Sequence, residues 1–448
     1  MQRHPVVITG VGVVSAIGTG GEAYFDALLQ ARSGVRSLGE RTDGDLQPPP
    51  DLDPDGVWIG APIIDFEPKQ YVKPRKALKV MCREIQTAFA SAQLACQHAL
   101  LAKSIPASED GKVKPDRLGV VFGSEIFFNP PAELIDPILA CVDEQGELHP
   151  GNFGNAARRD VMPLWMLKYL PNMPACQVGI SLNSRGPNNS LVLGDVSGPA
   201  ALLEAESYLQ RGAADVMVVG ATGTRLAATR LLYRTDMPTA ERAGHAIEDA
   251  SRPHDPRSLG VVGGEAAASV VLESIDHVRQ RNGRSLAEVV ATASRFIASE
   301  AMAHERRSAE REPDSKRGSA PAIAAAIEAV LQEGDVSPGD VGAVVGHGIG
   351  DRQMDAAEAE ALERCAITAP VVAIAASIGH TGAASGMMEL ATAALIAAHR
   401  FVPPSRGTDG NRRVNLKSEG QPLGSPYVLS VSHTSDGSAL AVLLRVTD

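Results

Sequence analysis

The sequence is poor in aromatic residues and has no excess of basic charge. Among its 448 residues are only 9 Phe, 2 Trp and 6 Tyr, whereas glycine occurs 43 times. This composition favours a core of Ala, Val, Leu and Ile, with backbones that approach closely. The 42 Lys and Arg residues are outnumbered by 53 Asp and Glu residues, which gives a formal net charge of -11. Because such a chain offers no basic surface, we expect it to bind neither nucleic acid nor an anionic membrane.

Cysteine is also scarce, and its spacing excludes two kinds of site. The five cysteines are an odd number without C-x-x-C spacing, so the sequence indicates neither a disulfide framework nor a zinc site. They are Cys82, Cys96, Cys141, Cys176 and Cys365. No run of about 18 uncharged apolar residues occurs, so a membrane-spanning helix is not expected. We therefore predict a protein of the reducing cytoplasm.

Short β-branched runs alternate with helical patterns, and this alternation predicts a parallel sheet with crossover helices. In the first half we expect strands at 6–10, 118–124, 191–193 and 214–220, and helices at 22–30, 76–101 and 200–210. In the second half we expect strands at 266–272, 341–345, 371–375 and 427–431, and helices at 321–332, 356–362 and 386–399. The chain thus divides into comparable α/β halves, residues 1–255 and 256–448. Segments 39–68 and 300–317 are predicted as surface excursions.

The pair Gly10 and Gly12 resembles part of a dinucleotide-binding fingerprint. The third glycine of that fingerprint is missing, and no helix follows directly. We interpret the two glycines as a feature of the end of a strand.

The turn Gly194-Asp195-Val196-Ser197-Gly198 lies between a predicted strand and a predicted helix. A turn of this kind presents one side chain at a helix N-terminus, where the helix dipole favours negative charge. Here that side chain is Asp195. On residue type alone an N-cap is the favoured interpretation, since Asp is among the best N-cap residues.

Two histidines, His347 and His380, each follow a predicted strand and are bracketed by glycines. The carboxyl ends of parallel strands are where α/β proteins place their ligand crevices. A neutral imidazole can donate a hydrogen bond to a carbonyl oxygen, and two histidines in matching contexts therefore indicate a functional site.

Several motifs spread over nearly the whole chain support a more specific interpretation. They are residues 7–15 (VITGVGVVS), 251–255 (SRPHD), 263–266 (GGEA), 347–362 (HGIGDRQMDAAEAEAL) and 379–386 (GHTGAASG). Together they resemble motifs of the β-ketoacyl-[acyl-carrier-protein] synthases of the type II elongating class, which are acyltransferases. The resemblance implies a thiolase-type fold, a five-layer αβαβα sandwich made of two related halves and usually dimeric. It also implies that acyl carrier protein delivers thioesters on its pantetheine arm and that no other cofactor is needed.

The same resemblance implies roles for particular residues and shows where the chain departs from the family. The nucleophilic cysteine falls on Asp195, whereas His347 and His380 match the histidines that hold the thioester oxygen and assist decarboxylation. The family's lysine, five residues before the second histidine, falls on Ala375, and the C-terminal gate lacks both of its phenylalanines. We expect substrate contacts at Ser197, at a position that is not nucleophilic in the family, and at the gate residues His433, Thr434 and Ser435.

Chain elongation needs a thiolate that is both a good nucleophile and a good leaving group. Asp195 would form a mixed anhydride at best, so we expect no condensing activity from this chain alone. One hypothesis is a partner that resembles a chain-length factor, pairs with a Cys-bearing ketosynthase and shapes an acyl tunnel. A homodimer is the alternative assembly.

Two further hypotheses use the histidines differently. In one, His347 and His380 stabilise the enolate formed when a malonyl thioester is decarboxylated, although an ionised Asp195 would repel both malonate and enolate. In the other, Asp195, His347 and His380 bind a divalent metal, with His433 close by. An Asp-His ion pair without any metal is the simpler expectation for the site.

Overall fold

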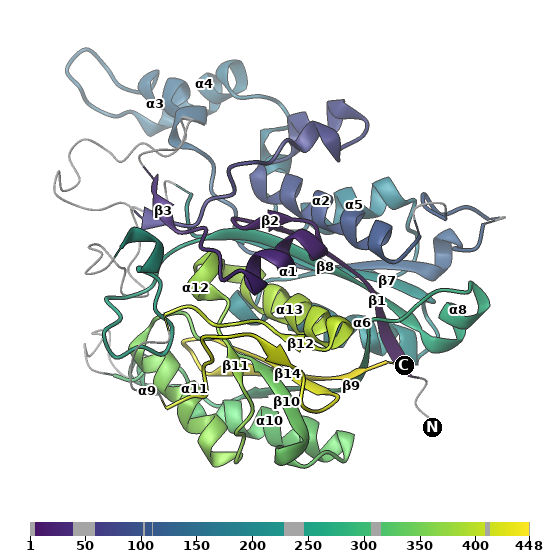
Figure 1. Ribbon diagram of the computed structural model, residues 1–448. Helices are drawn as coiled ribbons and strands as arrows, with labels where there is room; N and C mark the ends of the chain where they lie inside the picture. The colour runs from purple at the N-terminus through teal and green to yellow at the C-terminus, as the bar shows by residue number, and fades with distance from the viewer. Residues whose placement is uncertain are drawn as a thin grey trace.

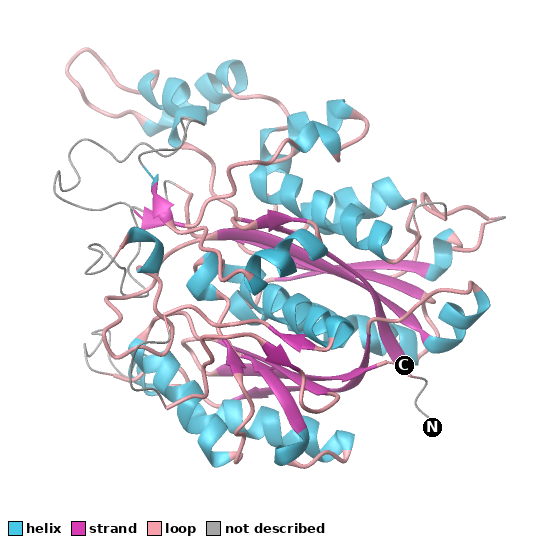
Figure 2. Cartoon of the chain, in the orientation of Figure 1, coloured by secondary structure: helices cyan, strands magenta, loops and turns pink. Residues whose placement is uncertain are grey.

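The computed structural model describes residues 5–38, 59–101, 104–109, 111–227, 246–305, 315–407 and 413–447. Within these ranges the main strands follow one hydrogen-bonded path, in the order β11-β10-β14-β15-β9-β1-β8-β7-β5-β6. Strand β1 pairs with β8 along nearly its whole length, but with β9 only through Val6, Val7 and Ile8. The path therefore divides there into two sets of five strands, which Figures 1 and 2 show as separate sheets on either side of α13.

The strands of the two sets have the following bounds. The first set is β1 (Val6–Ser15), β8 (Glu265–Ser274), β7 (Val216–Thr224), β5 (Leu118–Gly123) and β6 (Asn188–Leu191). The second set is β9 (Ala287–Phe296), β15 (Ser438–Val446), β14 (Tyr427–His433), β10 (Val341–Val345) and β11 (Val371–Val372). Short strands lie beside them: β2 (Gly18–Thr19), β3 (Arg36–Ser37), β4 (Ile59–Gly60), β12 (Phe401–Val402) and β13 (Gln421–Pro422).

Helices form the other three layers of the molecule. α2 (Arg83–His98) and α5 (Met173–Leu182) pack on the outer face of the first sheet, and α10 (Ala320–Gly334) and α11 (Arg352–Arg364) cover the second. α6 (Ser197–Gln210) and α13 (Ser385–His399) lie between the two sheets. This arrangement is the predicted five-layer sandwich. The remaining helices are α1 (Gly21–Leu29), α3 (Ile135–Leu139), α4 (Phe153–Asp160), α8 (Ile275–Gln280), α9 (Glu300–Glu305) and α12 (Ala375–Ile378).

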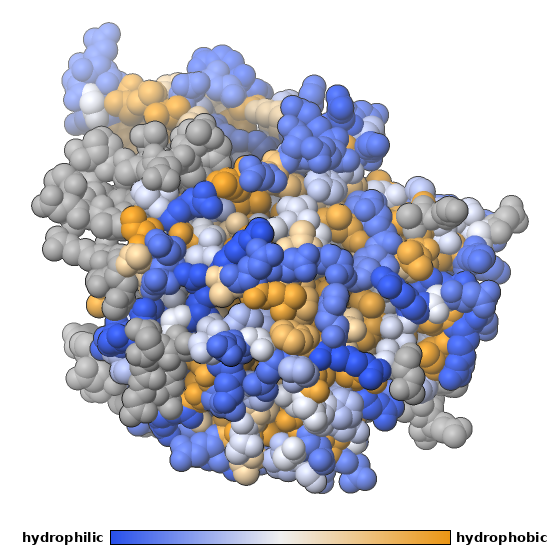
Figure 3. Space-filling view, in the orientation of Figure 1, coloured by the Kyte–Doolittle hydropathy of each residue, from blue (hydrophilic) through white to orange (hydrophobic). Residues whose placement is uncertain are grey.

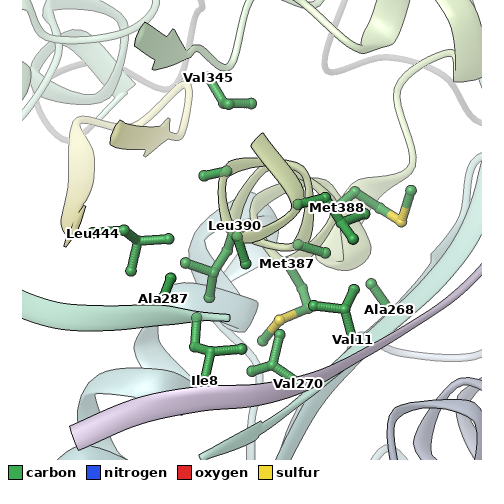
Figure 4. Close-up of a cluster of buried hydrophobic side chains, with 14 of the residues drawn as sticks. Ile8, Val11, Ala268, Val270, Ala287, Val345, Met387, Met388, Leu390 and Leu444 are labelled. Carbon is green, nitrogen blue, oxygen red and sulfur yellow. The ribbon is translucent and has the colours of Figure 1, made fainter. Parts of the chain in front are cut away.

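The central layer is apolar because both of its neighbours are sheets. Helix α13 contributes Met387, Met388 and Leu390, which point toward residues of both sheets in Figure 4. The first sheet supplies Ile8, Val11, Ala268 and Val270, and the second supplies Ala287, Val345 and Leu444. Small and β-branched side chains fill this space, in agreement with the aromatic-poor composition.

Gly10 and Gly12 lie within β1 and not at its end, so our interpretation of them was wrong. Helix α2 crosses them so closely that a Cβ built on Gly12 would be 2.1 Å from the carbonyl oxygen of Ser91. At Gly10 the distance to the carbonyl oxygen of Ala95 would be 2.2 Å. The glycines are therefore needed for packing between α2 and the sheet.

Other expectations are corrected by the strand pairing. The sheets are mixed: β5 is parallel to β6 and β7, and β10 is parallel to β11 and β14, whereas β1, β8, β9 and β15 pair only antiparallel. Strand β8, expected to open the second half, lies in the first sheet between β1 and β7. Strands β9 and β15 were not predicted. The long helix expected from residue 76 begins at Arg83, after a 3₁₀ segment over Arg75–Val80.

The predicted excursions lie mostly outside the described residues, since positions 39–58 and 306–314 are not described. All five cysteines are described, and each is a free thiol. Among the described helices none combines the length and the apolar character needed to cross a bilayer. The cytoplasmic location stays a prediction.

The close contact between α2 and β1 predicts a large effect of one methyl group. We expect Gly12→Ala to lower the free energy of unfolding by about 1–3 kcal/mol, because the added Cβ meets backbone atoms that cannot move independently. Gly154→Ala is the matched control: Gly154 lies in α4 with no atom within 4 Å of a built Cβ, so alanine should leave stability unchanged or raise it by up to about 1 kcal/mol. Urea unfolding of both variants measures the difference. Equal stabilities would contradict this account of the packing.

Candidate functional site

Asp195 lies on the turn that joins β6 to α6. The turn is a 3₁₀ segment, Gly194–Val196, in which Gly194 has a left-handed φ of 62°. The hydroxyl of Ser197 stabilises this turn. It accepts a hydrogen bond from the amide of Leu193 at 2.9 Å and donates one to the carbonyl of Gly194 at 2.6 Å. The N-cap of α6 is Val196, and no side chain caps the helix. The N-cap interpretation of Asp195 is therefore wrong, and its buried carboxylate is available for other partners.

Those partners are the two predicted histidines. His380 Nε2 donates to Asp195 Oδ1 at 2.9 Å, and His347 Nε2 lies 3.5 Å from Asp195 Oδ2. His347 follows β10, and His380 follows α12, where its backbone bridges to Gly263 of the segment before β8. The structure thus brings together side chains that are far apart in the sequence. All three are almost completely buried.

Glu389 orients the ring of His347 through the nitrogen that faces away from Asp195. Glu389 was not identified as a site residue from the sequence. His347 Nδ1 donates to Glu389 Oε1 at 2.7 Å, while the hydroxyl of Ser432 donates to the other carboxylate oxygen. The signal was present in the sequence, since Glu389 is the one charged residue between positions 385 and 397 of an otherwise apolar helix. A buried carboxylate in such a helix requires a polar partner.

Arg225 and Glu125 were also missed. Arg225 Nη2 lies 3.6 Å from Asp195 Oδ1, and its Nη1 lies 3.7 Å from Glu125 Oε2. Glu125 in turn accepts from the amide of Thr224 at 3.0 Å. Arg225 directly follows β7 and Glu125 lies just beyond β5, so the parallel pairing of these strands places both residues near the turn. No local motif marks either position.

A second carboxylate, Glu358, organises the loop that carries His347. It accepts hydrogen bonds from the amides of His347 at 2.9 Å and Gly348 at 2.8 Å. Its Oε2 also lies 3.5 Å from His254 Nε2 and 3.8 Å from His433 Nε2. Within the described chain, neither ring nitrogen of His433 or His254 has a hydrogen-bond partner. The ring of His433 packs edge-on beside the ring of His347, and its Nε2 faces Glu358 and not Asp195.

The remaining gate residues form the turn between β14 and β15. The amide of Thr434 donates to the carbonyl of Ser438 at 2.9 Å, and the carbonyl of Ser435 accepts from Gly318 at 2.9 Å. Asp436 and Ser438 of this turn, with Leu193, Val196 and Phe296, help to line a cavity of about 500 Å³ beside the Asp195 turn. Substrate binding by Ser197, His433, Thr434 and Ser435 stays a prediction.

The buried charges settle which groups are ionised. Burial opposes ionisation of Asp195, but the rings of His380 and His347 outweigh it and hold the pKa of this carboxyl well below its usual range. Burial likewise opposes a charge on His347, but Glu389 and Asp195 raise its pKa well above the usual value. Burial lowers the pKa of His380 despite the neighbouring carboxylate. At neutral pH the site therefore holds an aspartate, a protonated His347 and a neutral His380.

The thiols do not supply a reactive group in place of Asp195. Burial raises the pKa of Cys96 to about 12 and that of Cys365 to about 11. The pKa of Cys82 is also raised well above its usual value by burial. Cys141 follows α3 and Cys176 lies within α5, so neither belongs to the turn before α6.

Comparisons with known proteins agree with the fold and the motifs. The family model described as "Beta-ketoacyl synthase, N-terminal domain" matches residues 3–277, and "Beta-ketoacyl synthase, C-terminal domain" matches residues 298–409. The chain is 28% identical over 404 residues to the oxytetracycline polyketide putative beta-ketoacyl synthase 1 of Streptomyces rimosus, covering 89% of this chain and 86% of the relative. It is 27% identical over 421 residues to 3-oxoacyl-[acyl-carrier-protein] synthase 2 of Coxiella burnetii, covering 90% of this chain and 88% of the relative.

Solved structures show the same fold. The ishigamide ketosynthase/chain length factor matches with a TM-score of 0.77 and 21% identity, covering 100% of both chains. A type II polyketide synthase acyl-carrier protein in complex with its ketosynthase, bound to the hexaketide, matches with a TM-score of 0.75 and 19% identity, again covering 100% of both chains. The predicted thiolase-type fold is confirmed.

The ion pair at Asp195 predicts a pH-dependent contribution to stability. Because the folded-state pKa of Asp195 is depressed, its contribution is present above about pH 4 and is lost as the pH falls through the folded-state pKa. Because the folded-state pKa of His347 is raised, its contribution is present below about pH 6.5 and is lost as the pH rises through the folded-state pKa. The pair therefore stabilises the fold most between about pH 4 and pH 6.5.

We expect Asp195→Asn to lower the free energy of unfolding by about 3 kcal/mol at pH 6, since it leaves a buried charge on His347 without this partner. The difference from the unchanged protein should be smaller at pH 9, because this pH lies above the pKa of a histidine in the unfolded chain, and the contribution from the raised folded-state pKa of His347 declines above that point. Asp340→Asn, at an exposed aspartate, is the control and should change stability by less than about 0.5 kcal/mol at either pH. Urea unfolding at the two pH values measures these effects. A pH-independent loss in Asp195→Asn would show that the pair is not ionic.

Proposed function

Because this chain belongs to the β-ketoacyl synthase family, we propose that it is a subunit that does not condense acyl groups itself and that pairs with a Cys-bearing ketosynthase, in the manner of a chain-length factor. The observation that carries the proposal is the ion-paired, buried Asp195 on the turn before α6. The position of this turn between β6 and α6 is where a nucleophile elbow would present its side chain.

The chemistry of that side chain supports a non-condensing role. A carboxylate with a depressed pKa is a weak base and therefore a weak nucleophile. Its hydrogen bond to His380 occupies one of the two ring nitrogens that a thioester oxygen would need, and its negative charge lies 3.5 Å from the other, Nε2 of His347. An acyl group would therefore find neither a thiolate nor an open pair of donors at this turn.

Decarboxylation of a malonyl group is disfavoured for the same reason. The enolate that forms when carbon dioxide leaves needs donors aimed at its oxygen. Here His347 and His380 face a carboxylate that stays ionised, and its charge would repel both the malonyl carboxylate and the enolate.

The cavity beside the turn supports a role in accommodating an acyl chain. Its volume of about 500 Å³ falls within the range of small-molecule sites, and its walls include Leu193, Val196, Leu203, Phe296 and Leu440. Apolar walls of this kind would suit an acyl chain that is attached to the partner ketosynthase. We infer that acyl carrier protein brings that chain to the pair and that this subunit needs no cofactor for this accommodating role.

An exposed apolar surface supports pairing. Large apolar side chains are exposed along one stretch of the chain, from the α3–α4 excursion through α5 to the end of β6. They include Ile135, Leu139, Leu148, Leu164, Met166, Ile180, Val192 and Leu193. Figure 3 shows hydrophobic residues gathered on the α3–α4 excursion, which projects from the body of the molecule. Exposed apolar side chains that gather on one part of a surface mark protein–protein interaction sites, so we expect a partner to cover the excursion.

Pairing is tested by co-expression with a Cys-bearing ketosynthase. We expect a stable heterodimer, and Leu193→Glu should weaken it because a buried charge at the interface has no partner. Leu259→Glu is the matched control: Leu259 is 49% exposed and Leu193 is 51% exposed, but Leu259 lies outside the stretch described above. Size-exclusion chromatography with mass determination measures the assembly. A chain that remains a homodimer with every ketosynthase tested would overturn the proposal, as would equal weakening by both substitutions.

A further inference from the structure

The side chains of Asp195, His347 and His380 form a donor set with the dimensions of a metal site. One carboxylate oxygen and one ring nitrogen from each histidine all lie within 4.8 Å of one another. The shortest separation is 2.9 Å, between Asp195 Oδ1 and His380 Nε2, and His347 Nε2 is 3.5 Å from Asp195 Oδ2. A zinc ion that binds nitrogen and oxygen at about 2.0–2.2 Å holds neighbouring ligands roughly 3–3.5 Å apart. The two separations, which involve different oxygens of the Asp195 carboxylate, are close to that range, and a metal would draw in any donor atoms of the set that lie nearer the 4.8 Å limit.

The surroundings of His347 provide a second, independent observation. Its Nδ1 is bonded to Glu389 Oε1 at 2.7 Å, and Glu389 is itself bonded by Ser432. This fixes the ring so that Nε2 points toward Asp195, yet within the described chain the buried Nε2 has no hydrogen-bond partner. A carboxylate bonded to the far nitrogen of a histidine is the usual support of a metal-binding imidazole.

The charges around the set favour a cation. Asp195, Glu389 and Glu125 bring three carboxyl groups to this region. The opposing positive charges are the guanidinium of Arg225, which contacts Asp195 and Glu125, and the proton of His347, which a metal at Nε2 would displace. Arg225 opposes a metal at Asp195, but it does not balance all the acidic groups. Because the region is buried, their attraction for a divalent cation is only weakly screened.

Other histidines of the region do not join the set. His433 lies 3.8 Å from Glu358 through its Nε2, and its ring is beside that of His347. His254 also faces Glu358. We expected His433 to lie close to a metal at Asp195, but it faces Glu358 instead. Three protein ligands therefore remain.

We propose that Asp195, His347 and His380 bind one divalent first-row transition-metal ion, of the class of Zn²⁺ or Fe²⁺. Two imidazoles and one carboxylate suit these ions and leave further coordination positions for water or a small ligand. On binding, the protonated His347 releases its Nε2 proton to solvent and keeps the proton on Nδ1, whereas the neutral His380 shifts its single proton from Nε2 to Nδ1. Three metal-ligand bonds then replace the Asp-His contacts. The ion would also stabilise the fold, because the three ligands meet only in the native chain.

The test uses untagged, full-length protein, freed of metal with a chelator and then titrated with Zn²⁺ or Co²⁺ alone. We expect one equivalent to bind, with visible d–d absorption for Co²⁺ and a raised melting temperature. Asp195→Asn should weaken binding by at least about 100-fold, and Glu389→Gln by about 10- to 100-fold through loss of the support to His347. His380→Gln provides a second ligand variant in case Asp195→Asn does not fold, which circular dichroism checks.

The exposed group Asp143, Glu147 and His149 supplies the matched control, because it is the other set of donor atoms within 4.8 Å in the described chain. His149→Ala should leave the stoichiometry and the affinity unchanged. Absence of binding to the folded protein would overturn the proposal. Binding that survives both Asp195→Asn and His380→Gln but is lost in His149→Ala would overturn it as well, since the ion would then occupy the surface group. The pairing proposed above does not depend on either result.

Discussion

The contact between the Asp195 carboxylate and the rings of His347 and His380 is the interaction on which the account of this molecule depends. It joins the turn before α6 to two loops of the second half of the chain, and it does so where almost no water enters. A buried carboxylate is costly unless it is paired, and here a protonated histidine and a hydrogen-bonded neutral one provide the pairing. The same contact places a carboxylate on the turn before α6 and engages Nε2 of His380 in a hydrogen bond.

The central layer of the fold positions this contact. A Cβ built on Gly198 of α6 would be 2.6 Å from Cβ of Met387, and one built on Gly386 would be 2.7 Å from the carbonyl oxygen of Asp195. The first turns of α6 and α13 therefore approach each other so closely that only glycine fits at these two positions. That approach brings the Asp195 turn against the helix that carries Glu389, which in turn orients His347. The close packing of α6 on α13 and the orientation of His347 by Glu389 thus depend on the same region of the central layer.

Much of this arrangement could be predicted from the sequence, and the misses have physical causes. β-Branched runs indicated the buried strands, and the glycine-bracketed histidines indicated a functional site, while the convergence of His347 and His380 with Asp195 was implied by the family resemblance. His380 was expected after a strand but follows α12. β9 was missed because only continuous β-branched runs were interpreted as strands, although the alternating burial of Ala287–Phe296 is itself typical of a strand. β8 was placed in the wrong half because sequence order does not determine its pairing with β1 and β7. Arg225 and Glu125 reach the site through the pairing of β5 with β7, which a local motif does not reveal. Glu389 did leave a local signal, as the one charged residue in an apolar helix, but its partner His347 is 42 residues away. Gly10 and Gly12 were misread because their partner, α2, is about eighty residues away.

The most direct test of the central claim is intact-mass analysis of the folded chain, and of the carrier, after incubation with acyl- and malonyl-acyl carrier protein. The account predicts that this chain gains no acyl group and that the malonyl carrier is not converted to the acetyl form. In the presence of a Cys-bearing ketosynthase, the acyl group should appear on the ketosynthase alone. A covalent acyl adduct on this chain, at any residue, or acetyl carrier formed by this chain alone would contradict the account.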